Sequence, residues 1–218
     1  MKYRGRIITA CLILPIHTAY IIYYYIRDGR VDIADLSAYP LFIIIAYWAG
    51  LQYDKAVYYS NMDALTNLYN RRFIISAFGK IKSQVQRVKS RMFLLLIDCD
   101  KFKEINDTYG HAKGDAVLAS IAKTLTASTR PRDLIARWGG DEFVIIGHYK
   151  DEEKVLQVIL NLLETQLLEV ADKFDFPVTV SIGTAIFPDD GQDLDQLLRI
   201  ADENMYTCKR VKKTDFHP

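Results

Sequence analysis

The stretch DLIARWGGDEFVIIGHY (133–149) predicts the centre of the fold in this 218-residue chain. Two mainly apolar runs flank a pair of glycines, Gly139 and Gly140. Two such runs joined by a glycine turn are typical of a β-hairpin. Because glycine permits a positive φ and lets other groups approach the backbone, we expect an accessible turn that presents Asp141 and Glu142.

A second stretch, MFLLLIDCD (92–100), reads as a buried strand that ends in acidic residues. Asp98 and Asp100 are two residues apart, so both are expected to project from the same face. If the hairpin packs beside this strand, Asp98 and Asp141 converge at an open edge. Such an oxygen-rich site suits Mg²⁺ and two-metal phosphoryl transfer. Each motif alone fits a plainer reading, in which the acids cap the strand end and the glycines only form a turn.

The remaining soluble part alternates helix and strand signals. Apolar residues recur at helical spacing over 116–127, 151–170 and 193–209, and 178–187 reads as another strand. The sequence therefore predicts an α/β fold with a mixed sheet, containing at least one antiparallel pair, covered by helices. From residue 60 onward there are 22 basic and 23 acidic residues, so the basic surface of a nucleic-acid binder is missing.

The segment FKEINDTYGHAKGD (102–115) connects the first strand to the following helix. It carries Asn106, His111 and Asp115 as polar groups able to read a base edge, and Lys103 as a partner for phosphate. An Asn–Asp pair matches the donor–acceptor edge of guanine by the logic of base-edge readout.

The first 60 residues have a different composition, with ten of the 14 tyrosines and only ten of the 55 charged residues. Residues 7–26 and 37–53 are uncharged runs of twenty and seventeen residues, separated by a polar turn at 27–30. About 20 apolar residues span a bilayer as a helix. The basic residues before the first run favour a cytoplasmic N-terminus. We therefore expect a two-helix transmembrane hairpin that returns the chain to the cytoplasm.

Other readings of this region stay open. A cleaved signal peptide, a buried hydrophobic hairpin or a re-entrant second segment would also produce apolar runs, although no small-residue cleavage site follows Tyr23–Tyr25. His17 inside the first run is either a packing residue or a functional group. The three cysteines, at positions 11, 99 and 208, fit neither a disulfide framework nor a zinc cluster.

Residues 63–209 resemble the GGDEF family of diguanylate cyclases. The family's motifs occur in order as DALTNLYNRR (63–72), DCDKFKEINDTYGHAKGD (98–115), RWGGDEF (137–143), SIGTA (181–185) and ADENMYTCK (201–209). The resemblance implies a palm-like sheet related to those of adenylyl cyclases and polymerases. It also implies condensation of two GTP molecules into cyclic di-GMP, with release of pyrophosphate. We expect a membrane-anchoring region over 1–55 and a catalytic domain over 56–218.

The resemblance also implies roles for individual residues. Asp98, Asp141 and the backbone carbonyl of Cys99 resemble the ligands of Mg²⁺ or Mn²⁺, with the Cys99 side chain a small buried hydrophobe. Glu142 resembles the residue that takes the proton from the GTP 3′-hydroxyl, or is instead an additional metal ligand. The residues that resemble substrate contacts, through guanine or phosphate, are Phe102, Lys103, Asn106, His111, Asp115, Lys209 and Lys213.

The chain also departs from the family's pattern. The last helix commonly continues into Gly-Arg-Asn, whereas this chain has Lys212-Lys213-Thr214. Lys213 keeps the charge of the arginine but loses its bidentate fork, which weakens phosphate binding. Trp138 and Cys208 stand where tyrosine and alanine are usual and are expected to be packing substitutions. In the first motif, residues 70–72 are expected to cap and anchor the opening helix.

Arg130-Pro131-Arg132-Asp133 forms an RxxD sequence just before the catalytic turn. At this spacing it resembles the family's inhibitory site, where Arg130 and Asp133 bind cyclic di-GMP. The plainer reading is a surface Arg–Asp pair, worth about 0–1 kcal/mol.

The implied enzyme works as a homodimer, because the ring product needs two GTP sites facing each other. Its implied location is the bacterial inner membrane, as a multi-pass protein in contact with the lipid bilayer and with the catalytic domain in the cytoplasm. Three other functions remain: a non-catalytic receptor for cyclic di-GMP, another nucleotide cyclase with different base readers, and a membrane scaffold.

Overall fold

The strand expected at 92–100 is β2 (Arg91–Cys99), and it pairs antiparallel with two neighbours. One is β4 (Glu142–Tyr149), which forms the expected hairpin with β3 (Leu134–Arg137), and the other is β5 (Val180–Phe187). The two-residue β1 (Tyr69–Asn70) pairs parallel with β3 and completes a five-stranded sheet in the order β1-β3-β4-β2-β5. The mixed sheet predicted from the sequence is confirmed.

The computed structural model describes residues 3–31, 33–149 and 153–215, apart from the side chains of Asp35, 153–155 and 211–215. The chain divides into two compact units, Met1–Ser60 and Asn61–Pro218. The second unit contains the sheet and the helices α4 (Arg71–Arg87), α5 (Phe102–Tyr109), α6 (His111–Ser128), α7 (Glu153–Ala171) and α8 (Leu194–Asp215).

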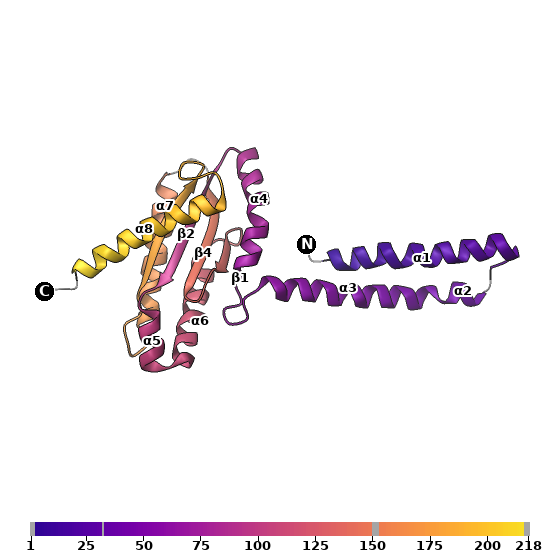
Figure 1. Cartoon of the computed structure of the whole chain (residues 1–218), viewed down its shortest axis with the longest axis horizontal. Helices are drawn as coiled ribbons and strands as arrows, with labels where there is room; N and C mark the ends of the chain where they lie inside the picture. The colour runs from indigo at the N-terminus through magenta and orange to yellow at the C-terminus, as the bar shows by residue number, and fades with distance from the viewer. Residues whose placement is uncertain (1–2, 32, 150–152, 216–218) are drawn as a thin grey trace. The chain divides into compact units, whose positions relative to one another are not determined.

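Helices cover both faces of the sheet (Figure 1). Successive residues of β2 point to opposite faces. Phe93, Leu95 and Ile97 belong to the core shared with α5, α6 and α7, whereas the alternate residues of β2 belong to the core shared with α4 and α8. Burial on both faces explains why this strand reads as an unbroken apolar run.

The ends of two helices show how local sequence sets the fold. Asn70 is the N-cap of α4, and its side-chain oxygen accepts a hydrogen bond from the Phe73 amide at 3.1 Å, as expected of a capping residue. The segment 102–115, expected to be a connection, is instead α5 followed directly by the start of α6. Gly110, at φ 83° and ψ 157°, separates the two helices, because this positive φ favours glycine and ends α5.

The first unit contains α1 (Arg4–Asp28), the short α2 (Ile33–Ser37) and α3 (Tyr39–Asn61). α1 and α3 touch at Gly5 and Gly50, where a Cβ on Gly50 would lie 2.4 Å from the Arg6 Cα. The Thr9 hydroxyl donates to the Ala46 carbonyl at 2.7 Å. Small residues and such polar bonds are typical of helix pairs in membranes.

Of these helices, α1 is long and apolar enough to cross a membrane, judged by length and composition. The second expected span, 37–53, is not confirmed. Within the described residues α3 does not meet the same criterion. Two packed helices are therefore observed, and one of them is a candidate span.

Candidate functional site at the edge of the sheet

The acidic residues of two strands meet at one end of the sheet. The antiparallel register of β2 and β4 places Asp98 directly opposite Glu142. The Cys99 amide donates to the Asp141 carbonyl at 3.2 Å, which connects the turn 139–142 to the end of β2. The structure therefore brings Asp98, Asp141 and Glu142 to the same edge, as the sequence predicted for a hairpin packed beside the first strand.

A lysine from the last helix reaches this edge. Lys209 Nζ lies 2.5 Å from Asp98 Oδ1, and both side chains are largely buried. Lys209 comes from α8, which packs closely on β5: a Cβ at Gly183 would meet the Ala201 carbonyl. The ammonium group supplies positive charge next to the carboxylates. The carboxylates would attract a cation, and the ammonium group would attract the phosphates of a nucleotide.

Two of the carboxyl groups at this edge, those of Asp98 and Glu142, have a raised pKa. Burial raises the pKa of Asp98, although the bond from Lys209 opposes the shift. Burial also raises the pKa of Glu142, and the negative charges of Asp98, Asp141 and Asp202 raise it further. Asp202, on α8, is a site residue that the sequence analysis missed. Its position seven residues before Lys209, on the same helix face, is the signal that could have identified it.

The glycine turn differs from the expectation of a positive φ. Neither Gly139 nor Gly140 has one. Gly139 instead provides space, because a Cβ there would lie 2.6 Å from Glu142 Oε2. A Cβ on Gly140 would meet nothing within 4 Å, so the outer side of the turn is open to a ligand. The absence of side chains, and not backbone freedom, makes glycine suitable here.

Asp100 proves to be a strand-end cap. Its carboxylate accepts hydrogen bonds from the Thr179 hydroxyl at 2.9 Å and the Ser181 hydroxyl at 2.7 Å. The plainer reading is therefore right for Asp100, whereas Asp98 faces Lys209. The Cys99 side chain is 1% exposed, and burial raises the pKa of its thiol to about 12. The thiol stays protonated, which fits a small hydrophobic residue.

Five of the seven residues expected to bind substrate lie on α5 and α6, and the other two, both lysines, lie on α8. Phe102 and Lys103 are the first residues of α5, where helix amide groups favour anions. The Asn106 side chain lies against Gly114: a Cβ on that glycine would clash with Asn106 Oδ1. Asp115 follows directly and is exposed, as is His111 at the start of α6. The structure thus brings Asn106 next to the turn of helix that carries Asp115.

The RxxD sequence forms a tight turn at the other end of the sheet, where β3 begins. The Arg130 amide donates to Asp133 Oδ2 at 3.1 Å, and the Asp133 amide donates to the Arg130 carbonyl at 2.9 Å. Asp133 is 8% exposed, and its Oδ1 is buried without a hydrogen-bond partner among the described residues. Burial raises the pKa of this carboxyl. A simple surface pair does not account for a buried, unpartnered carboxylate oxygen.

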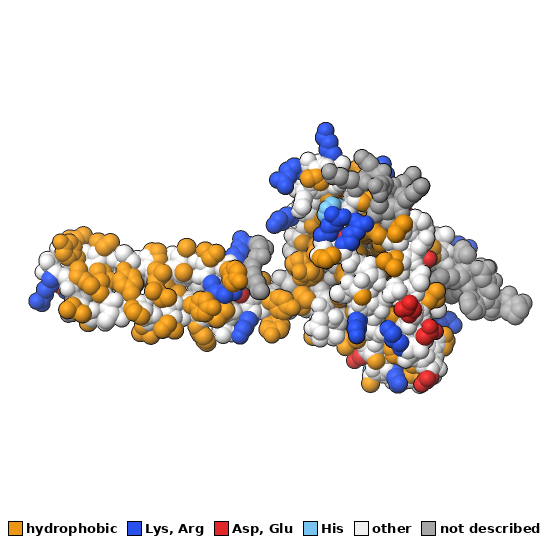
Figure 2. Space-filling view, turned by 180° about the vertical axis from the view of Figure 1, so that it is seen from behind, with side chains coloured by type: hydrophobic (Ala, Val, Ile, Leu, Met, Phe, Trp, Pro, Cys, Tyr) orange, Lys and Arg blue, Asp and Glu red, His pale blue; other side chains and the backbone are white. Residues whose placement is uncertain are grey.

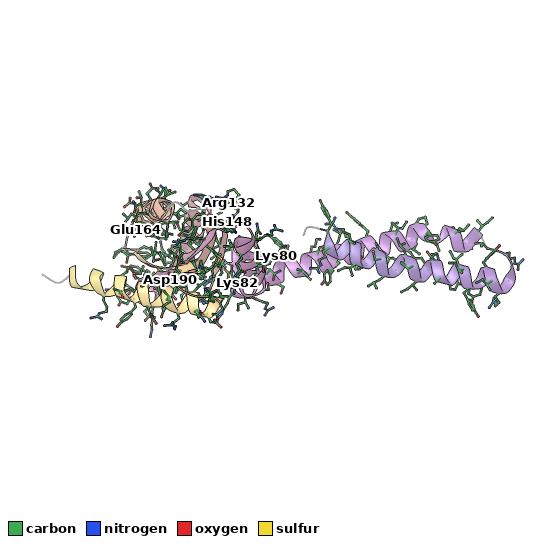
Figure 3. The ribbon with its side chains drawn as sticks, turned by 90° about the horizontal axis from the view of Figure 1, so that it is seen from above. Lys80, Lys82, Arg132, His148, Glu164 and Asp190 are labelled. Atoms are coloured by element: carbon green, nitrogen blue, oxygen red, sulfur yellow. The ribbon has the colours of Figure 1, made fainter. Side chains whose placement is uncertain are left out.

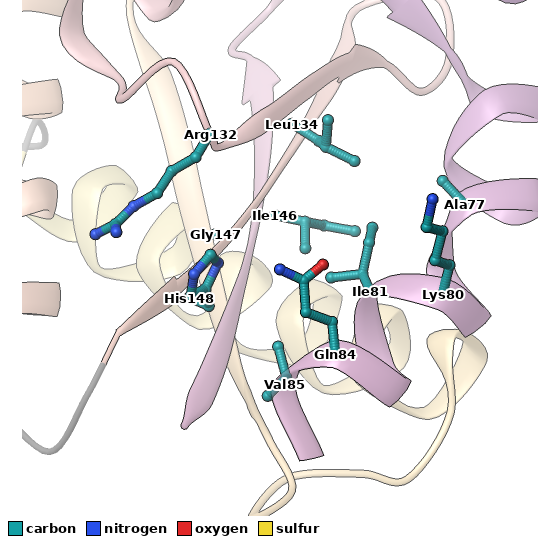
Figure 4. A pocket seen from close by; sticks show the side chains of 10 residues that line it. All are labelled: Ala77, Lys80, Ile81, Gln84, Val85, Arg132, Leu134, Ile146, Gly147 and His148. Carbon is teal, nitrogen blue, oxygen red and sulfur yellow. The ribbon is translucent and has the colours of Figure 1, made fainter. Parts of the chain in front are cut away.

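A cavity of about 290 Å³ lies beside this turn, between α4 and the β3–β4 hairpin (Figure 4). Lys80, Gln84, Arg132 and His148 provide its polar lining, and Ile146 is among the apolar residues. Figure 3 shows Lys80, Arg132 and His148 on this side of the unit, and Figure 2 shows Lys and Arg side chains gathered near a histidine. None of the predicted catalytic residues lines this cavity, which the sequence analysis did not identify.

Lys213 and the metal ligands complete the predicted set. The side chain of Lys213 lies outside the described residues. Among the described side chains, no three His, Cys, Asp or Glu groups converge to form a complete metal cage. Mg²⁺ does not require one, because it is commonly held by one or two carboxylates together with waters and substrate phosphates. Two carboxylates and a carbonyl therefore remain a suitable donor set.

Comparison with known proteins agrees with this arrangement. Residues 60–215 match the family model described as diguanylate cyclase, GGDEF domain. The chain is 38% identical over 152 residues to diguanylate cyclase DosC of Escherichia coli, covering 68% of this chain and 33% of that protein. It is 33% identical over 170 residues to diguanylate cyclase TpbB of Pseudomonas aeruginosa, covering 76% and 39%. The chain thus matches little more than a third of the length of these relatives.

Solved structures show the same fold. The GGDEF domain of TpbB, also called YfiN, superposes with a TM-score of 0.63 at 33% identity, covering 68% of this chain and 88% of that one. The coiled coil and GGDEF domain of DgcB from Caulobacter crescentus, solved in complex with c-di-GMP, gives a TM-score of 0.66 at 25% identity, covering 73% and 86%. With the acidic edge and the ordered motifs, these matches show that the chain belongs to the GGDEF family of diguanylate cyclases.

Proposed function

We propose that this protein is a diguanylate cyclase, which condenses two GTP molecules into cyclic di-GMP and releases two pyrophosphates. The observation that carries the proposal is the register of β2 and β4, which sets Asp98 opposite Glu142 with Lys209 beside them. Relatives named diguanylate cyclases support it. In each half-reaction the 3′-oxygen of one GTP attacks the α-phosphorus of the other, and the bond to pyrophosphate breaks.

Asp98, Asp141 and the Cys99 carbonyl would hold Mg²⁺ or Mn²⁺. When bound, the metal ion neutralises the charge that develops on the phosphate oxygens. The 2.5 Å contact with Lys209 supports a cation site at Asp98, because this carboxylate already pairs with a positively charged group. Lys209 would then contact the phosphates together with Phe102, Lys103 and Lys213.

Glu142 acts as the general base in this proposal. Burial and the neighbouring carboxylates raise its pKa, which makes it a stronger base than an ordinary glutamate. It takes the proton of the 3′-hydroxyl as the oxygen–phosphorus bond forms. Asn106 and Asp115 select guanine, and His111 lies at the same end of α6 as a further substrate contact. Positioning and charge stabilisation account for most of the rate enhancement.

The N-terminal unit would anchor the enzyme in the bacterial inner membrane, with the catalytic unit in the cytoplasm. Large apolar residues cover the unit's surface (Figure 2), including Ile16 on α1 at 70% exposed and Trp48 on α3 at 61%. A lipid bilayer would cover such a surface. Holding the chain in a membrane also favours the homodimer, since two catalytic units must face each other.

The membrane assignment predicts that the full-length chain pellets with membranes and resists extraction by salt or carbonate. A fragment starting near Ser60 should remain in the supernatant, because it lacks the exposed apolar helices. Recovery of the full-length chain in the soluble fraction without detergent would show that the N-terminal unit is not a membrane anchor.

The Arg130–Asp133 turn would bind cyclic di-GMP as an inhibitor. A guanidinium group recognises a guanine edge or a phosphate, and the unpartnered Asp133 Oδ1 can accept a bond from the guanine amino group. Because the turn lies at the opposite end of the sheet from Glu142, inhibition should be non-competitive with GTP.

The activity is tested by incubating the purified full-length protein with GTP and Mg²⁺ and measuring cyclic di-GMP and pyrophosphate. The wild type should form both, whereas Glu142→Gln should bind GTP but form no product. A receptor without catalytic activity would bind cyclic di-GMP and leave GTP intact. Product formation by Glu142→Gln at the wild-type rate would exclude Glu142 as the base.

A further inference from the structure

Arg137, the last residue of β3, connects the catalytic turn to the beginning of the second unit. Its Nη2 and Nε atoms donate to the Gly140 carbonyl at 2.7 and 3.1 Å. Its Nη1 atom donates to Asp63 Oδ1 and Oδ2 at 3.2 and 3.3 Å. One guanidinium group therefore joins two backbone segments that are 74 residues apart through Asp63.

Asp63 is itself held in place on the other side. Its Oδ1 accepts bonds from the Thr66 amide at 2.9 Å and the Thr66 hydroxyl at 2.7 Å. Its amide donates to the Leu68 carbonyl at 2.8 Å, and its carbonyl accepts from the Asn67 amide at 2.9 Å. The loop 63–68 is thus closed around Asp63, which lies two residues beyond the end of α3 at Asn61.

The ion pair is protected from water. The side chains of Arg137 and Asp63 are 18% and 22% exposed. Burial alone would raise the pKa of Asp63, but the bonds from Thr66 and the charge of Arg137 outweigh it and hold the pKa below its ordinary value. Asp63 is therefore ionised at neutral pH, and the planar guanidinium fork of Arg137 reaches both its carboxylate and the Gly140 carbonyl.

The hydrogen bonds to the Gly140 carbonyl restrict the conformation of the turn 139–142. This carbonyl belongs to the peptide that leads into Asp141, whose own carbonyl accepts from the Cys99 amide. The Trp138 amide closes the turn by donating to the Glu142 carbonyl at 2.7 Å. Rotation of the Gly140 peptide would therefore displace Asp141 and Glu142 from their places beside Asp98.

We propose that Arg137 is a positioning residue that sets the geometry of the turn 139–142 and couples it to the loop 63–68, directly after α3. The inference rests on the proposed cyclase function. A change in the loop at Asp63 then alters the orientation of Asp141 and Glu142, so the rate of condensation depends on how the chain enters the second unit.

The test compares Arg137→Lys, Arg137→Ala and Asp63→Asn with a matched control in the full-length protein. The control is Arg91→Lys, since Arg91 pairs with Asp189 at 3.1 Å in the same unit but at the other end of the sheet from the catalytic turn. Arg137→Lys and Asp63→Asn should each lower kcat about tenfold or more with KM for GTP changed less than threefold. The double variant should be no worse than Arg137→Lys alone, because the two residues act in one chain of contacts.

Two further measurements separate positioning from stability. Guanidinium ion at millimolar concentration should partly restore kcat of Arg137→Ala, whereas methylammonium should not. Wild-type kcat in both Arg137 variants, or equal losses of kcat and Tm in Arg137→Lys and Arg91→Lys, would overturn the proposal. If the wild type makes no product, amide hydrogen exchange still decides: faster exchange at 139–142 in Arg137→Lys supports the coupling, and unchanged exchange contradicts it.

Discussion

The two ends of the sheet differ in how the negative charge of a carboxylate is compensated. At one end Asp98 lies opposite Glu142 and is paired with Lys209 at 2.5 Å. At the other end Asp133 keeps one oxygen, Oδ1, buried and without a hydrogen-bond partner among the described residues. Burial raises the pKa of both aspartates.

This difference indicates two kinds of task. At the Asp98 end the ammonium group of Lys209 already compensates a carboxylate, and under the proposed function a metal ion would take the place of that group. At the Asp133 end Oδ1 lacks such compensation, and an incoming ligand with an N–H donor would supply it. A buried acceptor without a partner reduces stability, which is commonly tolerated where a residue serves binding.

The largest effect is expected from Asp98→Asn. Losing a charged metal ligand and the partner of Lys209 should lower the rate of cyclic di-GMP formation by about 100-fold or more, as removal of transition-state charge stabilisation typically does. Steady-state rates over a range of Mg²⁺ concentrations measure it. Asp100→Asn, two residues away, is the control and should keep the rate within about tenfold, because Asp100 bonds to Thr179 and Ser181. Equal losses would remove the distinction between the two acids.

A smaller effect is expected from Asp115→Ala. Losing one hydrogen-bond partner of guanine costs about 1–3 kcal/mol, so KM for GTP should rise roughly 10- to 100-fold and discrimination against ATP should fall. Competition between GTP and ATP measures the discrimination. Asp107→Ala, an exposed acid on the neighbouring helix, should change neither quantity. If the wild type uses ATP as readily as GTP, the guanine assignment is wrong.

The smallest expected effect is on stability, and it is a gain, whereas the two preceding changes cause losses of activity. Asp133→Asn should raise the free energy of unfolding by about 1 kcal/mol at pH 7, because it removes a buried charge with an unpartnered oxygen. Since the folded-state pKa of Asp133 is raised, the penalty is complete above that pKa and absent below the ordinary aspartate value of about 3.9. The gain should therefore disappear as the pH falls below about 4 in denaturant titrations. A loss of stability at pH 7 would show that the carboxylate is compensated after all.

The sequence predicted the sheet well for a physical reason. β2 is buried on both faces and the hairpin has a glycine turn, so hydrophobic pattern alone identifies them. The helix α5 and the start of α6 at His111 were missed, because α5 is only eight residues long and Gly110 interrupts the apolar period. The extent of α3 was also underestimated, since Asp54 and Lys55 end the uncharged run but not the helix.

The candidate site was only partly predictable. Asp98, Asp141 and Glu142 follow from strand ends and a turn, whose register the sequence pattern determines. The contact of Lys209 with Asp98 spans 111 residues, and that of Arg137 with Asp63 spans 74. Such contacts depend on how helices pack on the sheet, which no local pattern encodes. The cavity beside Arg132 likewise arises from the packing of α4 against the hairpin.

Whether the two ends of the sheet have separate tasks is tested most directly by progress curves of cyclic di-GMP formation at increasing concentrations of added product. The curves are measured for the wild type, Arg130→Ala and Glu142→Gln. If the two ends of the sheet have separate tasks, the wild type stalls early and Arg130→Ala starts at the same rate but continues. Glu142→Gln should make no product and still bind cyclic di-GMP. Coinciding curves for the wild type and Arg130→Ala, or turnover by Glu142→Gln, would contradict the account.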